Sequence, residues 1–169
     1  MLSSMRWIAA CLGIAAQSTS GAGLPPEGKF EFVFCYGGDV KVIEHSTNVM
    51  GGTASVSGPI RSMSEGGVLD KTAASCHSTF TVVQSKINEY GFCEVVDADG
   101  DRMFYAYTSD AQGGRWTGYP GSGKYQSYLW QAEWERMGPF PSATPGKVQG
   151  CHRAWGSFRH SKATEFQAK

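Results

Sequence analysis

Short runs in which apolar residues recur at every second position, separated by glycine-containing turns, make up most of this chain. Residues 29–36 (KFEFVFCY) are the clearest run, with Phe30, Phe32, Phe34 and Tyr36 on one face. This two-residue period is typical of a β-strand. Gly37 and Gly38 predict a break after it. Further clear runs occupy residues 39–45, 79–84, 90–96, 102–107, 124–131 and 149–158, and weaker ones occupy residues 54–61 and 115–118.

Seven to nine short strands with glycine turns predict an all-β domain, either a barrel or a sandwich. We favour a single small antiparallel β-barrel of about eight strands in meander order over residues 23–158, followed by a flexible polar tail at 159–169. Some strands are apolar on both faces, since Val33 and Cys35 alternate with phenylalanines. A barrel with a lined interior and a partly covered outside would produce this pattern, and so would a homo-oligomer that buries the outer face.

A tryptophan-rich segment at residues 127–137 departs from the strand pattern. Trp130, Glu133 and Trp134 have spacings that would suit a turn or two of helix, which would cover the barrel mouth. Alternatively, the carboxylates of Glu133 and Glu135 beside the tryptophans could grip a sugar or act as acid and base.

Residues 1–22 have the composition of a secretory signal peptide. Arg6 provides a positive charge before an apolar run at residues 7–16, and the small residues Ser20, Gly21 and Ala22 resemble a signal-peptidase site. The apolar run is too short to cross a bilayer, which takes about 20 residues. The segment therefore predicts export, so that the mature protein is secreted or periplasmic and has no membrane span.

Four cysteines remain once the predicted signal peptide is removed: Cys35, Cys76, Cys93 and Cys151. In an exported chain an even number of cysteines predicts disulfides, here two, and four cysteines allow three pairings. The sequence does not choose among the three. No two of these cysteines lie within five residues of each other, as paired ligands of a zinc site would.

The segment 97–101 (DADGD) predicts a hairpin turn with Gly100 in a left-handed conformation. Because Asp97, Asp99 and Asp101 stand at positions 1, 3 and 5, a Ca²⁺ site is the alternative. The histidines form no zinc motif, and a formal charge of zero provides no field to hold nucleic acid. We therefore expect no cofactor and no nucleic-acid partner.

Two segments resemble a known type of barrel. Residues 91–104 (GFCEVVDADGDRMF) and 121–125 (GSGKY) are similar to uncharacterised exported bacterial proteins in which a Cys-x-x-x-Asp-Ala-Asp-Gly-Asp hairpin precedes a Gly-x-Gly-Lys-Tyr turn. Those proteins in turn look like the allene oxide cyclase and dirigent type of eight-stranded barrel. The resemblance ends after Tyr125, where the tryptophan-rich segment follows. It implies a hydrophobic cavity, oligomers and no cofactor, and it transfers no catalytic residue to this chain.

Three functions fit these observations. The first is binding of an apolar or aromatic small molecule in the barrel cavity, for which the candidate residues are Trp116, Tyr125, Trp130 and Trp134. The second is a cofactor-independent isomerase, cyclase or lyase acting in the same cavity, for which the catalytic candidates are Tyr105, Tyr107, His152 and Arg153. The third is a structural or partner-binding protein whose apolar outer faces contact another chain.

Export with cleavage near Ala22 is directly testable. N-terminal sequencing of the secreted or periplasmic form should find a chain that begins at or near Gly23, because the small-residue site ends at Ala22. A mature chain that still begins at Met1 would contradict this prediction.

Overall fold

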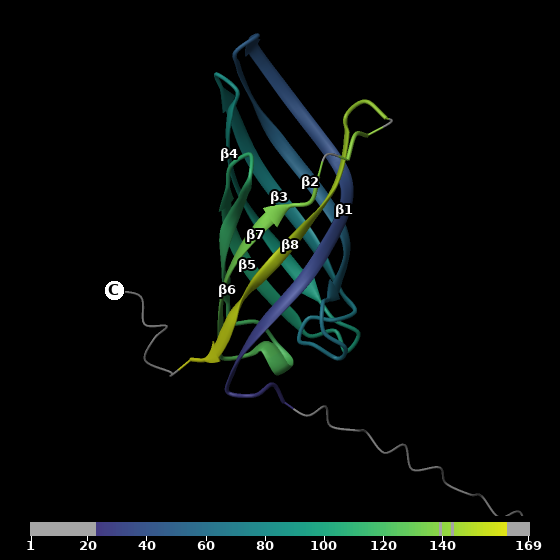
Figure 1. Ribbon diagram of the computed structural model, residues 1–169, viewed down its shortest axis with the longest axis vertical. Helices are drawn as coiled ribbons and strands as arrows, with labels where there is room; N and C mark the ends of the chain where they lie inside the picture. The colour runs from purple at the N-terminus through teal and green to yellow at the C-terminus, as the bar shows by residue number, and fades with distance from the viewer. Residues whose placement is uncertain (1–22, 139, 143, 162–169) are drawn as a thin grey trace, which may run out of the picture.

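The computed structural model describes residues 23–138, 140–142 and 144–161, so the predicted signal peptide lies outside the described residues. A closed barrel of eight antiparallel strands is formed, in which each strand pairs with the next and the last pairs with the first (Figure 1). The elements are β1 (Glu27–Ser46), β2 (Val49–Ser62), β3 (Thr72–Val83), β4 (Lys86–Val96), β5 (Arg102–Ser109), β6 (Gly113–Tyr119), the short 3₁₀ helix η1 (Gly123–Tyr125), β7 (Tyr128–Arg136) and β8 (Lys147–His160). The predicted all-β barrel in meander order is confirmed.

The expected break at Gly37 and Gly38 is wrong, because β1 continues through both residues. Gly38 lies against the backbone of β2, and a Cβ atom there would collide with the carbonyl oxygen of Ser55. The glycine therefore permits a close approach of two strands and does not end one of them.

The turn or two of helix that the spacing within residues 127–137 would suit does not form, because residues 128–136 form β7. Tyr128, Trp130, Ala132 and Trp134 are all buried, and the residues between them are more exposed. This alternation allows one face of the segment to fill the barrel, whereas a helix would direct the same aromatic side chains to several sides. At the other boundary, β8 extends two residues beyond the expected end and includes His160, while residues 162–169 of the predicted tail lie outside the described residues.

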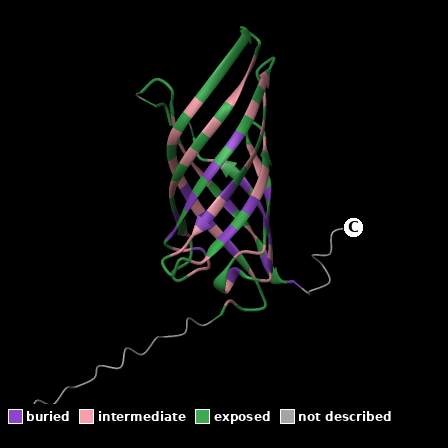
Figure 2. Cartoon of the chain, turned by 180° about the vertical axis from the view of Figure 1, so that it is seen from behind, coloured by how far each residue is buried: buried purple, intermediate pink, exposed green. Residues whose placement is uncertain are grey.

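The two ends of the barrel differ in how they are filled. The β1–β2 and β3–β4 turns lie at one end, at the top of Figure 1, which we call the hairpin end; η1 and the start of β1 lie at the other, which we call the filled end. Buried positions concentrate toward the filled end, whereas the hairpin tips are exposed (Figure 2). Trp130 is completely buried there and packs on Phe158, with 4.8 Å between ring centroids.

Two disulfides join neighbouring strands, as the sequence predicts. Cys35 of β1 bonds to Cys151 of β8, and Cys76 of β3 bonds to Cys93 of β4. In both pairs the cysteines stand directly opposite each other in the strand register, with Cα atoms 4.0 and 4.1 Å apart. Cys76 and Cys93 are buried inside the barrel. This arrangement is one of the three pairings that the sequence allows.

The Asp97–Asp101 turn and the 121–125 segment form a single cluster at the filled end. Asp97 Oδ1 accepts hydrogen bonds from the backbone N–H groups of Asp99 and Asp101, at 2.9 and 3.0 Å. The Lys124 Nζ atom lies 2.7 Å from Asp97 and 3.0 Å from Asp99, and Gly100 has the predicted positive φ of 84°. A bound Ca²⁺ would have to displace the lysine ammonium, so the geometry favours the plain turn. Among the described residues no three metal-ligating side chains gather into a site.

Replacing Asp97 should therefore destabilise the barrel much more than replacing Asp99. Asp97→Ala removes an almost fully buried carboxylate together with its backbone and lysine hydrogen bonds, and should lower the free energy of unfolding by about 2–4 kcal/mol. Asp99→Ala is the matched control, because this carboxylate is 72% exposed and pairs only with Lys124, and it should cost less than about 1 kcal/mol. Denaturant unfolding at pH 7 with and without EDTA measures both effects. A drop in stability on adding EDTA would show that the turn holds a metal.

Candidate functional site

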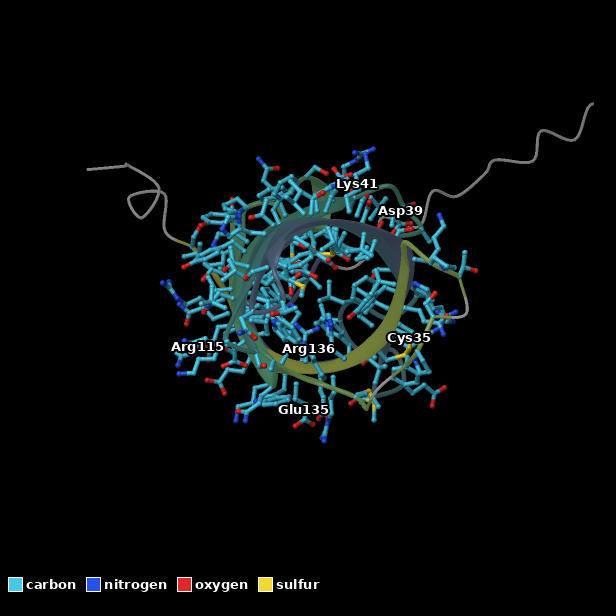
Figure 3. All side chains as sticks on the ribbon, turned by 90° about the horizontal axis from the view of Figure 1, so that it is seen from above. Cys35, Asp39, Lys41, Arg115, Glu135 and Arg136 are labelled. Carbon is cyan, nitrogen blue, oxygen red and sulfur yellow. A yellow bond between two sulfur atoms is a disulfide. The ribbon has the colours of Figure 1, made fainter. Side chains whose placement is uncertain are left out.

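A cavity of about 250 Å³ occupies the barrel interior toward the hairpin end. The side chains around it are mainly apolar and aromatic: Phe34, Tyr36, Phe80, Tyr105, Tyr107, Trp116 and Trp134, with the disulfide-bonded Cys76 and Cys93 and the polar residues Ser78, Glu89, Arg136 and His152. The Arg136 side chain is 31% exposed, so solvent reaches the cavity at this end. Figure 3 looks along the barrel and shows Arg136 inside the ring of strands.

The base of the cavity is formed by two aromatic rings in close, tilted contact. Tyr105 and Trp116 lie 4.6 Å apart between ring centroids, and each is only 3% exposed. The phenol of Tyr105 contacts Cys76 Sγ at 3.9 Å. Burial raises the pKa of Tyr105 well above its usual value, so the hydroxyl keeps its proton at neutral pH.

His152 lies in the aromatic wall. Its ring packs on Trp134 at 4.7 Å and meets the edge of Phe34 at 5.2 Å. Burial and, to a smaller extent, the nearby Arg136 cation lower the pKa of His152, Glu89 opposes them, and the resulting pKa is about 4. The imidazole is therefore neutral at physiological pH and can serve as a hydrogen-bonding wall residue.

The two charged residues of the cavity, Glu89 and Arg136, form an ion pair. The Glu89 carboxylate accepts hydrogen bonds from Tyr107 Oη at 2.9 Å, from Ser109 Oγ at 3.1 Å and from the Arg136 guanidinium at 3.2 Å. The guanidinium also lies over the Trp134 ring, at 5.2 Å from its centroid. The two charges compensate each other, and their hydrogen bonds hold both side chains in place. Burial and the Glu89 charge raise the pKa of Tyr107.

Most, but not all, of the residues that the sequence singles out line this cavity. Tyr105, Tyr107, His152, Trp116 and Trp134 do so. Tyr125 and Trp130 do not, because both are buried in the core near the filled end, where their rings contact each other.

Arg153 is not a cavity residue. It lies on the outer wall and forms ion pairs with Glu31 and Glu135. Glu133 and Glu135 also lie outside the barrel, and Figure 3 shows Glu135 there. The alternation along β7 and β8 separates these charges from the tryptophans inside, so the alternative carboxylate–tryptophan site does not form.

Sequence reasoning did not identify Glu89 and Arg136 as a pair, although a signal was present. On β4, Glu89 lies an even number of positions from Ile87, Cys93 and Val95, so it faces the interior as they do. On β7, Arg136 lies two positions after Trp134 and faces the interior as well. A charged side chain at a strand position that faces the apolar interior needs a partner inside the barrel. Finding that partner requires the strand order, which a single sequence does not provide.

The outer wall carries a second aromatic feature. His77, Phe92, Phe104 and Tyr119 lie on four successive strands, with 5.6, 5.6 and 6.4 Å between consecutive ring centroids. Phe92, Phe104 and Tyr119 are each more than 40% exposed. This row accounts for part of the outward-facing apolar character that the sequence shows.

No family model, curated protein or solved structure matched the chain. Within the described residues there is no helix with the length and apolar character needed to cross a membrane.

The depressed pKa of His152 makes stability depend on pH. Between pH 6.5 and about 4 the unfolded chain binds a proton at this position and the folded barrel does not, so stability is highest above pH 6.5 and falls as the pH drops. The full effect of this group is about 3 kcal/mol. His152→Phe should remove that part of the pH dependence, whereas the matched change His77→Phe on the outer wall should keep it. Denaturant unfolding at several pH values measures the difference, and parallel profiles for wild type and His152→Phe would contradict the prediction.

Proposed function

We propose that this protein binds an apolar or aromatic small molecule in the barrel cavity. The observation that carries the proposal is the cavity of about 250 Å³ with its aromatic lining. An apolar cavity of about 150 Å³ holds benzene, and drug-sized ligands occupy about 300–1,000 Å³. The ligand that suits this space is therefore a molecule with one or two rings. A hydrophobic cavity is also what the resemblance to the allene oxide cyclase and dirigent type of barrel implies, and membership of that type is part of the proposal.

The titratable groups of the cavity favour binding over catalysis. Glu89 is held by three hydrogen-bond donors, so its carboxylate is poorly placed to accept a substrate proton. His152, with a pKa of about 4, is a weak base at neutral pH. The tyrosines keep their protons because their pKa values are raised. These groups can orient a ligand through hydrogen bonds without taking part in a reaction.

We further propose that the protein acts outside the cytoplasm, in the periplasm or the extracellular medium. Two disulfides support this location, because the cytosol keeps most thiols reduced. The composition of residues 1–22 supports it independently.

A cavity-filling substitution tests the binding proposal. Val56 lines the cavity, and the neighbouring Ser57 is exposed on the outside of β2. In isothermal titration calorimetry with naphthalene, Val56→Phe should weaken binding by about tenfold or more, because the added ring takes space that the ligand would fill and burial of that ligand surface is worth more than about 1.4 kcal/mol.

Ser57→Phe is the matched control and should leave the affinity within about twofold of wild type. The thermal melting temperatures of the two variants check that both remain folded. Equal binding by the wild type and Val56→Phe, or no binding by the wild type, would show that the cavity is not the ligand site. Independently of these variants, native mass spectrometry of the protein isolated from its own source would identify a bound natural ligand by its mass.

A further inference from the structure

His152 brings two unsatisfied ring nitrogens to the cavity wall. Its ring is surrounded by the rings of Phe34, Tyr36 and Trp134, which line the same cavity. Among the described residues neither nitrogen has a hydrogen-bond partner. Both nitrogens keep accessible surface, since His152 is partly exposed and neither atom belongs to the buried side-chain atoms that lack a partner.

The accessible surface of these nitrogens faces the cavity. Side chains at alternate positions of β8 point into the barrel, and His152 shares this direction with the buried residues Ala154 and Phe158. In the strand register His152 stands directly opposite Phe34 of β1 and Arg136 of β7, and both of these residues line the cavity. A ligand inside the cavity can therefore contact the imidazole directly.

The neutral imidazole offers this ligand a hydrogen-bond acceptor. The pKa of His152 is about 4, so at neutral pH one ring nitrogen carries a proton and the other is an acceptor. The other strong acceptor of the lining is the Glu89 carboxylate, which already receives hydrogen bonds from Tyr107, Ser109 and Arg136. The unprotonated nitrogen of His152 is thus the strong acceptor that the cavity leaves open to a ligand.

The charges beside His152 decide which donor fits. The imidazole and the Arg136 guanidinium both lie against the Trp134 ring, at 4.7 and 5.2 Å from its centroid. The guanidinium would repel a cationic donor such as an ammonium group, and the Glu89 charge is already compensated by Arg136. A carboxylate has no proton to donate. A hydroxyl is a small neutral donor, and it adds little polar surface to a ligand that must otherwise suit apolar walls.

We infer that the ligand is an aromatic or alicyclic alcohol whose hydroxyl donates a hydrogen bond to the unprotonated ring nitrogen of His152. This inference rests on the proposed function and specifies its ligand class. Arg136, directly opposite His152, is the last residue of β7 and its side chain is partly exposed. The hydroxyl therefore lies toward the mouth of the cavity, and the apolar part of the ligand fills the base against Tyr105 and Trp116.

Three probes of similar size test the inference. 2-Naphthylmethanol carries the hydroxyl, 2-ethylnaphthalene replaces it by a methyl group, and 2-naphthonitrile carries a polar group that can only accept. His152→Phe keeps an aromatic ring and removes both nitrogens. By calorimetry at neutral pH it should weaken binding of the alcohol by about three- to tenfold and change binding of the other two by less than about twofold. Comparing each probe between the two proteins cancels the different costs of taking the probes out of water.

His77→Phe is the matched control. His77 is exposed on the outer wall and does not line the cavity, so this change should leave the relative affinities of the three probes unaltered. Thermal melting temperatures check that both variants remain folded.

Nitrogen NMR of isotope-labelled histidine rings provides a readout in the wild-type protein. The resonance of the unprotonated His152 nitrogen should lie at lower frequency in the complex with 2-naphthylmethanol than in the complex with 2-ethylnaphthalene, because accepting a hydrogen bond shields this nitrogen. His152 can be assigned as the signal that is missing from His152→Phe.

Failure of the inference can be told apart from failure of the proposed function. The inference is wrong if His152→Phe weakens all three probes equally, if it weakens the alcohol and the nitrile equally, or if the nitrogen resonances of the two complexes coincide. In each of these cases the cavity binds ligands, but His152 does not accept a hydrogen bond from them. If none of the probes binds the wild type, the proposed function and the inference both fail.

Discussion

The pairing of β1 with β8 is the interaction on which the rest of the structure depends. Without it the eight strands would form an open sheet with two unpaired edges, and the side chains that now line the cavity would face water. The register runs from Glu27 opposite Arg159 to Asp39 opposite Lys147, and the Cys35–Cys151 disulfide lies within it. Closure turns one face of the sheet into an interior, and only then do the aromatic residues of β5, β6 and β7 surround a common space.

The size of the inward-facing residues determines where the barrel is full and where it is hollow. Toward the filled end, Trp130 and Phe158 occupy the interior from β7 and β8. Toward the hairpin end, β2 and β3 contribute the small residues Ala54, Val56 and Ser78 to the cavity wall. The cavity is thus a consequence of residue volume within a regular alternation, and no irregularity of the backbone is needed to form it.

The two-residue period predicted the barrel and most of its strands, because inward and outward positions differ in polarity along each strand. It failed at Gly38, where glycine allows close packing of two strands, and over residues 128–136, where Trp130 and Trp134 are spaced as they would be on a helix. The candidate site was only partly predictable. The alternation of inward and outward residues along β5, β6 and β8 places Tyr105, Trp116 and His152 inside. The ion pair between Glu89 and Arg136, however, depends on which strands face each other across the barrel.

The disulfide at the seam also changes what a cut in the chain would do. Cys35 and Cys151 are separated by 116 positions, so the covalent loop that they close contains β2 to β7, the latter part of β1 and the start of β8. A protease that cleaves one exposed hairpin tip, such as the β1–β2 tip beyond the 77% exposed Ile43, would open this loop without releasing either fragment. The two pieces would stay tethered at the seam and keep their neighbouring strands in register. A barrel built this way can survive nicking in a protease-rich environment as a two-chain molecule.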